Sequence, residues 1–256
     1  MTSTPSVNRR LGPIELTPGV TPVNAVVKLL GAFVGIGALS GIAILQSYIF
    51  NAHLHIPRGE QGTLAGNLAF WSEVVGLLLF FPFGIAADRI GRRPVLTFGF
   101  VLLALGWALY PFATTANELL IYRFIYAVGA AATAVTLATL VNDYPVENSR
   151  GKLIGATSMM NTLGTMFFAG VIGQIPHLLS ERGYDAVSGG RAMFLTGAAL
   201  CALMALLSAK GLKAGTPAGR NARPSLGVLA ASVARAMRNP RIALAYAGAL
   251  VARSDV

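Results

Sequence analysis

The stretch GIAADRIGRRPVL, residues 84–96, forms a short polar turn between two long apolar runs. Gly84 lets neighbouring helices approach each other closely, and Gly91 suits a tight turn because glycine has no Cβ to clash. The three arginines hold such a turn at the cytoplasmic face of a membrane. A turn that needed only positive charge would have no use for Asp88, so this acid points to a second role.

Six apolar runs are long enough to cross a bilayer as helices. A hydrocarbon core about 30 Å thick needs roughly 20 apolar residues, and the chain is 54% hydrophobic and only 12% charged. The runs lack strand-like alternation, and lipid leaves no free backbone groups unpaired, so we expect helices. The predicted spans are Val26–Phe50, Leu64–Ala86, Val95–Ala113, Asn117–Val141, Leu153–Ile175 and Ala192–Ala209, and a seventh run begins at Ile242.

Lysine and arginine are concentrated in alternate connections between these runs, which predicts the orientation of the chain. The basic connections lie before the first run, in the quoted turn, around Arg150 and after Ala209, whereas the complete loops of the other side hold Arg58, Arg182 and Arg191. The basic side is therefore expected to be cytoplasmic. The net charge of +10 follows from this topology and does not indicate a nucleic-acid site.

The runs and their flanking segments divide the chain into four parts. A basic amphipathic stretch, Ser225–Arg238, lies in the segment before the seventh run. The seventh run covers about 15 Å, half of what a crossing needs, so we expect a fragment of a protein roughly twice as long. The expected parts are a cytoplasmic tail (1–24), a six-span transmembrane domain (25–210), a cytoplasmic linker with an amphipathic helix (211–241) and a truncated start of the seventh span (242–256), all in or at the cell membrane.

Two further motifs follow the quoted turn. Residues 123–131 read RFIYAVGAA, and Asp143 is followed by PVENSRGK at residues 145–152. The turn resembles the G-x-L-A-D-R-x-G-R-[RK]-x-x-[LI] loop of the major facilitator superfamily, with Ala86 in place of Leu. The later motifs are similar to that family's R-x-x-x-G-x-G-A-A pattern, with Ala127 in place of the first Gly, and to its acidic residue with P-E-x-x-R-G. The three motifs come in the family's order across the six-span unit.

The resemblance implies an all-α, polytopic membrane protein. Its fold is a six-helix bundle of two inverted three-helix repeats, half of a twelve-span structure around a central cavity. The implied partners are the lipid bilayer, a small-molecule substrate, H⁺ and the missing carboxy-terminal six-helix half. The implied activity is secondary active transport of a small organic solute, coupled to protons, by alternating access. A facilitative uniporter, or a non-transporting sensor or assembly subunit on the same scaffold, stays open.

Enzymatic activity is not expected. The sequence has no G-x-x-x-x-G-K-[ST] stretch that would bind and hydrolyse ATP. It also offers no nucleophile–base pair, and its few histidines lack the further ligands of a metal site. No cofactor is implied.

The resemblance assigns a role to charged residues at the cytoplasmic ends of the second and fourth spans. In the family, matching residues form a charge relay that latches the outward-facing state together with helices of the other half. That role falls here on Asp88, Arg92 and Asp143, because both spans run from outside to inside and end at the same face. The residues expected in this latch are Gly84, Asp88, Arg89, Gly91, Arg92, Arg93, Asp143, Glu147 and Arg150.

Two charged residues lie deep in predicted spans. Glu73 should lie ~13 Å below the outer surface, and Arg123 ~9 Å below it, so the two depths permit a pair. A charge in lipid costs at least ~2.5 kcal/mol, so each should face the protein interior or a wet cavity. We expect Glu73 and Arg123 to couple transport to protons, with a structural ion pair as the alternative.

Polar residues of the first and fifth spans are candidates for contact with a substrate. Serine and threonine are equally common where helices pack, so their presence alone does not decide. Lys28, near the inner end of the first span, is expected to extend its ammonium to the headgroups. The cavity candidates are Gln46, Tyr48, Ser158, Asn161, Thr162 and Thr165.

Overall fold

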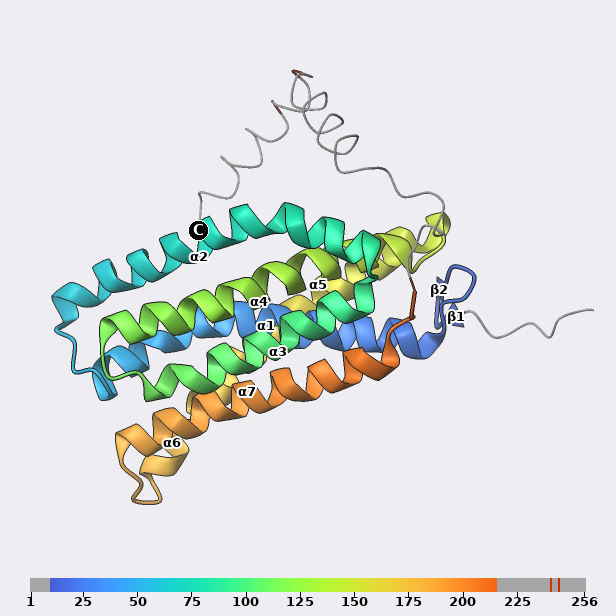
Figure 1. Ribbon diagram of the computed structural model, residues 1–256. Coiled ribbons are helices and arrows are strands. Elements are labelled where there is room, and N and C mark those ends of the chain that lie inside the picture. Colours follow the sequence, from blue (N-terminus) through green and yellow to red (C-terminus); the bar gives the residue numbers. More distant parts are fainter. Residues whose placement is uncertain (1–9, 216–239, 241–243, 245–256) are drawn as a thin grey trace, which may run out of the picture. The chain divides into compact units, whose positions relative to one another are not determined.

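The computed structural model describes residues 10–215 and the single positions 240 and 244 (Figure 1). The chain divides into two compact units, residues 1–216 and 217–256, and the helices named below belong to the first. Most of the predicted linker helix and of the seventh span lies outside the described residues.

Long helices account for most of the first unit. Within the described residues, six helical stretches are long and apolar enough to cross a membrane, as the sequence predicts. The elements are β1 (Arg10–Leu11), β2 (Ile14–Glu15), α1 (Pro22–Ala52), α2 (Arg58–Arg89), α3 (Arg92–Leu109), η1 (Tyr110–Phe112), α4 (Ala116–Asp143), η2 (Glu147–Ser149), α5 (Arg150–Met166), η3 (Phe167–Val171), η4 (Ile172–Gln174), α6 (Ile175–Ser180) and α7 (Ala186–Gly211).

Side-chain caps define where three of the spanning helices begin. Thr21 accepts a hydrogen bond from the backbone N–H of Asn24, whose own side chain accepts one from the backbone N–H of Thr21. Thr115 caps α4 in the same way as Thr21 caps α1, and Asp185 caps α7. Each cap satisfies an N–H that has no partner inside its helix.

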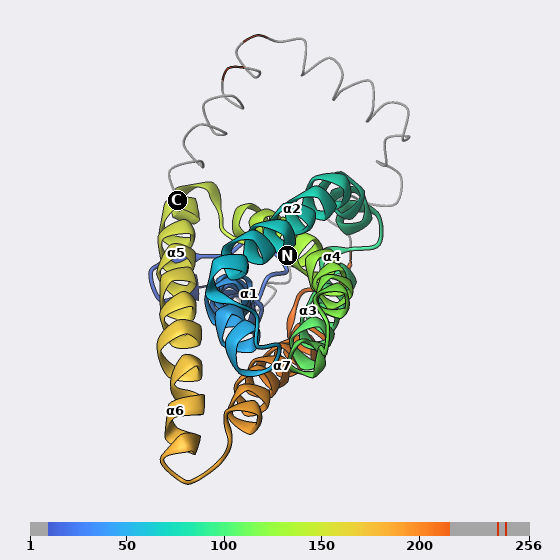
Figure 2. The ribbon, with the colours of Figure 1, turned by 90° about the vertical axis from the view of Figure 1, so that its left-hand side faces the viewer.

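Helix packing follows the inverted repeat that the family resemblance implies. The first repeat is α1, α2 and α3, and the second is α4, the α5–α6 stretch and α7. Helix α1 of the first repeat packs on α5 of the second, α4 packs on α2, and α3 packs on α7. In Figure 2, α5 lies at the left margin of the bundle and α2 at its top, with α1 near the centre and α3 and α4 at the right. Equivalent helices of the two repeats therefore have equivalent neighbours.

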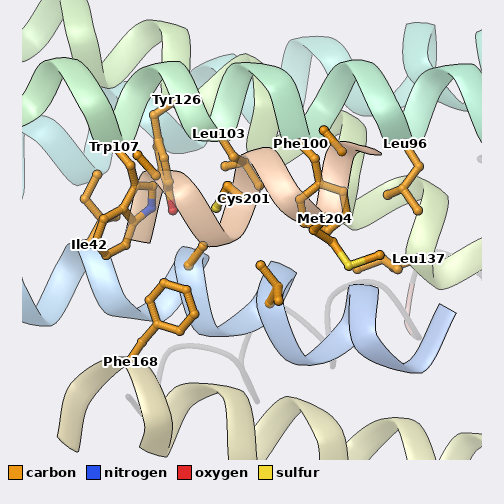
Figure 3. Packing of buried hydrophobic residues seen from close by; sticks show 14 of the residues in the cluster. Ile42, Leu96, Phe100, Leu103, Trp107, Tyr126, Leu137, Phe168, Cys201 and Met204 are labelled. Atoms are coloured by element: carbon orange, nitrogen blue, oxygen red, sulfur yellow. The ribbon is translucent and has the colours of Figure 1, made fainter. Parts of the chain in front are cut away.

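The core lies where α1, α3 and α7 meet (Figure 3). The ring centroid of Trp107 lies 5.0 Å from that of Phe194 and 5.4 Å from that of Phe168. Glycines admit these large rings: a Cβ on Gly197 would overlap the indole of Trp107. Such contacts hold helices together in lipid, where packing takes over from the hydrophobic effect.

The fifth span is less regular than predicted. The α-helix gives way to a π-helical turn at Phe167–Val171 and a 3-10 turn at Ile172–Gln174 before α6. The wide turn lies against α1, where a Cβ on Gly41 would stand 3.0 Å from the Phe168 side chain. Where π-helix occurs inside an α-helix, it is usually a single turn of this kind.

The amino-terminal segment is not a free tail. Residues 10–21, here called the N-terminal strap, form a two-stranded hairpin and then run to α1. Leu16 of the strap bridges with Pro145, in the turn between α4 and α5. Alternation over such short strands is too brief to read from a sequence, so the docked strap was not predicted.

Candidate functional site

Three charged side chains of the predicted latch meet at one end of the bundle. Asp88 lies in the last turn of α2, Arg92 is the first residue of α3, and Asp143 is the last residue of α4. The Arg92 Nη2 atom lies 3.4 Å from Asp88 Oδ1, and its Nε atom forms an ion pair with Asp143 Oδ2. One guanidinium thus bridges two carboxylates from two helices.

The bridge is unevenly exposed. The Arg92 side chain is 13% exposed, against 34% for Asp143 and 68% for Asp88. The Nε–Oδ2 approach is a charge contact and not an aligned hydrogen bond, since neither atom has a hydrogen-bond partner in the described part of the chain. Arg92 therefore depends chiefly on Asp143 for charge compensation, and its buried Nη1 has no partner among the described residues.

Gly91 makes the turn between α2 and α3 possible. Its φ of +106° lies in a region that side chains with a Cβ rarely adopt. A Cβ here would also stand 2.8 Å from the carbonyl oxygen of Gly215, which follows α7. The expected role of Gly91 in a tight turn is confirmed, and this turn presents Arg92 toward both acids.

The other predicted latch residues do not join this bridge. Glu147 and Arg150 form a separate, exposed pair at 2.7 Å in the turn before α5. Arg89 and Arg93 make no ion pair with a described residue. The expectation that Gly84 allows a close helix approach is wrong for this unit, because a Cβ there would meet only Val135, at 3.9 Å.

Arg123 is buried, but its partner is not Glu73. Its Nε donates to Ser72 Oγ at 2.8 Å, and its guanidinium lies over the Tyr126 ring, 4.8 Å from the centroid. Glu73 is exposed on α2 and forms no ion pair with a described residue. The predicted pair is therefore absent from the structure, although the depths of both residues allow it.

Polar groups that the sequence analysis missed surround Arg123. Tyr110 donates to Gln46 Oε1 at 3.2 Å, and Tyr126 donates to the Leu39 carbonyl at 3.0 Å. Tyr126 lies three residues after Arg123 on α4, so helical spacing could have identified it. Nothing in the sequence singles out Tyr110.

The predicted cavity residues differ in their exposure and in the contacts they make. On α5, Ser158 and Thr162 are exposed, whereas Asn161 and Thr165 are half-buried. Tyr48 instead donates to the Ala186 carbonyl at 3.0 Å, at the other end of α1 from the charge bridge. A hollow of about 520 Å³ is lined by other residues, namely Arg93, Pro94, Thr97, Phe98, Ala209, Ala214 and Gly215.

Lys28 does not extend to the headgroups as expected. Its side chain is fully buried in this unit, and its Nζ donates to Thr157 Oγ1 on α5. Thr157 in turn donates to the Leu153 carbonyl at 2.7 Å, so its oxygen is free to accept from Lys28. No described carboxylate pairs with this ammonium. Residue depth, which suggested snorkelling, does not tell which side of α1 the side chain lies on.

Metal ligands do not cluster in the part of the chain that the structure describes. No group of three or more His, Cys, Asp or Glu side chains is close enough to hold an ion there.

Comparisons with known proteins indicate the family to which this chain is related. A sequence model described as Major Facilitator Superfamily matches residues 29–253. The magnetosome protein MamH of Paramagnetospirillum magneticum is 29% identical over 224 residues, which cover 84% of this chain and 49% of that protein. The inner membrane metabolite transport protein YgcS of Escherichia coli is 33% identical over 111 residues, 43% of this chain and 24% of that protein.

One solved structure has a similar fold. A D-xylose-proton symporter superposes with a TM-score of 0.59 at 16% identity, over 87% of this chain and 53% of that one. At this identity the similarity concerns the fold alone. The chain spans about half the length of MamH, and about half of the symporter.

Proposed function

The chain belongs to the major facilitator superfamily, and on that premise we propose that it is one half of a secondary active transporter working by alternating access. The proposal rests on one observation above the others. Arg92 bridges Asp88 and Asp143 where α2, α3 and α4 meet, at the end of the bundle that carries the basic connections. We take this bridge as the latch that stabilises the outward-facing state, and this end as cytoplasmic.

Charge and burial support a switch at this place. Exposed ion pairs contribute only ~0–1 kcal/mol each. Arg92 is largely buried, however, and its buried Nη1 still lacks a partner among the described residues. Removing one carboxylate would leave this cation poorly compensated, which costs more than the exposed pair is worth. Closure of the second half over this end would bury the bridge further.

Neutralising one acid tests the latch. In the complete protein, Asp88→Asn should shift molecules from outward-facing to inward-facing by about two- to tenfold, because the bridge loses one of its two anions. Impermeant thiol reagents would report the shift at single cysteines replacing Ser47, at the outer end of α1, and Ser158, in the cytoplasmic part of α5. The native Cys201 is fully buried and should stay unlabelled. The same labelling ratio in variant and parent, with unchanged flux, would reduce the bridge to a topology signal.

Proton coupling is proposed for Glu73. It is exposed on α2, next in sequence to Ser72, which binds the buried Arg123. A carboxylate on an exposed face of a membrane helix, open to the proposed second half, can take up and release a proton as the cavity changes sides.

A coupling assay separates this role from a structural one. Glu73→Gln should abolish accumulation of solute against its gradient but preserve exchange, since only the titrating group is lost. D-xylose, the solute named for the structural neighbour, is the first of a panel of labelled metabolites to test. Glu60→Gln, in the exposed first turn of α2, is the matched control. Uphill accumulation by Glu73→Gln would overturn the assignment, and solute entry without any proton dependence in the parent would favour the uniporter.

A further inference from the structure

The N-terminal strap closes the same end of the bundle as the charge bridge. Its apolar side chains Ile14, Leu16 and Val20 are buried, so the segment is part of the packed core. In Figure 1, the strands of the strap lie beside the end of the bundle at which α7 ends. The sequence analysis treated these residues as a tail, and nothing in the proposed function uses them.

Backbone hydrogen bonds join the strap to the turn between α4 and α5. The N–H of Thr17 donates to the Tyr144 carbonyl at 2.9 Å, and the N–H of Val146 donates to the Glu15 carbonyl at 3.0 Å. The N–H of Glu15 donates to Ser149 Oγ at 3.1 Å. These bonds run in both directions, as between two strands, so the strap holds the turn along its length.

The Thr17 hydroxyl reaches the end of α4 itself. Its Oγ1 lies 3.1 Å from the Asp143 carbonyl oxygen and 3.2 Å from that of Tyr144, and it can donate to either. The last carbonyl groups of a helix have no hydrogen-bond partner within the helix. The Thr17 hydroxyl donates to such a carbonyl and thereby stabilises the end of α4. The strap thereby binds the backbone that carries the Asp143 carboxylate.

Tyr144 extends the contact to the end of α7. Its hydroxyl accepts from the Lys213 N–H at 3.3 Å, and the Lys213 Nζ donates to the Pro18 carbonyl of the strap at 3.1 Å. Burial raises the pKa of the Tyr144 phenol to about 12, so the hydroxyl stays neutral. The strap, the end of α4 and the end of α7 therefore form one hydrogen-bonded unit.

We propose that the N-terminal strap is a positioning element for the latch, and that Thr17 holds Asp143 where its carboxylate meets Arg92. This inference rests on the proposed function, since it concerns what sets the strength of that latch. Undocking of the strap would free the last turn of α4 and let Asp143 leave Arg92. Docking would favour the outward-facing state, and any event that pulls the strap away would favour the inward-facing one.

Single substitutions at Thr17 test the positioning role. Thr17→Val keeps the shape but removes the hydroxyl, and it should shift the labelling ratio at Ser47→Cys and Ser158→Cys toward inward-facing by about threefold. Thr17→Ser, which restores a hydroxyl, should recover the parent ratio. Thr196→Val is the matched control, because the Thr196 hydroxyl binds only its own helix on an exposed face. A role confined to stability would lower the yield of folded protein without changing this ratio.

A disulfide cross-link tests the same proposal by holding the strap in its docked position. Leu16→Cys with Pro145→Cys would place two thiols at bridged positions of the strap and the α4–α5 turn. The disulfide should form readily and shift the ratio toward outward-facing, and reduction should reverse the shift. This variant does not depend on whether Thr17→Val folds.

The outcomes separate the strap from the latch itself. If Asp143→Asn shifts the ratio but Thr17→Val and the cross-link do not, the strap is a structural cover only and the positioning role is wrong. If Asp143→Asn, Thr17→Val and the cross-link all leave the ratio unchanged, the proposed latch fails, and the strap's role fails with it. A shift in both Thr17→Val and Asp143→Asn, without an additive effect in the double variant, supports one shared pathway.

Discussion

Helices α2 and α3 are similarly apolar but very differently covered. In the most apolar stretch of α3, 50% of the residues are buried, whereas the figure for α2 is only 11%. The fifth span, which takes the place of α2 in the second repeat, is 22% buried. Apolar composition therefore tells that a helix lies in the membrane, but not whether protein or lipid covers it. The two open helices are the ones that the inverted repeat makes equivalent, and their free surface is where the proposed second half would pack.

The two tryptophans provide the largest contrast between these regions. Trp107 on α3 is fully buried, and Trp71 on α2 is 39% exposed. Trp107→Ala should lower the free energy of unfolding by about 3–5 kcal/mol, because it leaves a cavity that the rings around it cannot fill. Trp71→Ala should cost about 1 kcal/mol or less. Unfolding in detergent, followed by circular dichroism, measures both, and equal losses would contradict the contrast.

Two glycines on the fifth span sharpen the comparison within one helix. A Cβ on Gly164 would overlap the Phe33 carbonyl of α1, whereas a Cβ on Gly155 meets nothing within 4 Å. Gly164→Val should cost about 1–3 kcal/mol or prevent folding, since α1 and α5 must separate. Gly155→Val should change stability by roughly 0.5 kcal/mol or less. The yield of monodisperse protein and its melting temperature would show whether only one side of α5 is packed.

A smaller effect on stability is expected from the protonation of His53, which is packed against neighbouring residues. Nδ1 of His53, after α1, lies 3.0 Å from the Pro111 carbonyl oxygen, and a Cβ on Gly190 would overlap its Nε2. Burial lowers the pKa of His53 from 6.5, and the nearby Arg191 lowers it further, against the opposing effects of the Pro111 hydrogen bond and Asp185. The folded protein thus binds the proton less well than the unfolded chain does, so this contribution is complete above pH 6.5 and lost as the pH falls through the lowered pKa.

The melting temperature should therefore decrease more steeply between pH 7 and pH 5 in the parent than in His53→Gln. The substitution removes the titrating ring, so it should flatten this part of the profile even if it lowers stability at pH 7. Identical slopes in parent and variant would show that the carboxy-terminal end of α1 is not packed as described.

The spans and their order could be predicted from the sequence, because they follow from length and apolarity. The charge bridge was implied by the family resemblance, through the two motifs that place Asp88, Arg92 and Asp143 at the ends of neighbouring helices. The depth of a residue in a span can be estimated from the sequence, but the direction in which its side chain points around the helix axis cannot. Ser72 and Glu73 are adjacent and lie at nearly the same depth. Successive residues of α2 point in directions about 100° apart, however, and it is Ser72 that accepts a hydrogen bond from Arg123. Lys28 differs from the expectation for the same reason.

Other features depend on contacts between distant residues. The π-helical turn at Phe167–Val171 accompanies a ring that packs against the glycine face of α1, which no local pattern shows. The N-terminal strap is ordered by hydrogen bonds to residues more than 120 positions away. Neither feature has a periodicity that a sequence analysis could detect.

A charge exchange is the most direct test of the latch. Arg92→Asp places three acids together and should move most of the labelling from Ser47→Cys to Ser158→Cys in the complete protein. Exchanging both partners, Arg92→Asp with Asp143→Arg, restores opposite charges across the same contact. We predict that the double variant recovers at least about half of the parent's outward-facing signal, as expected for residues that act through each other. A double variant that recovers no more of the outward-facing signal than Arg92→Asp alone would contradict the claim that this ion pair stabilises the outward-facing state.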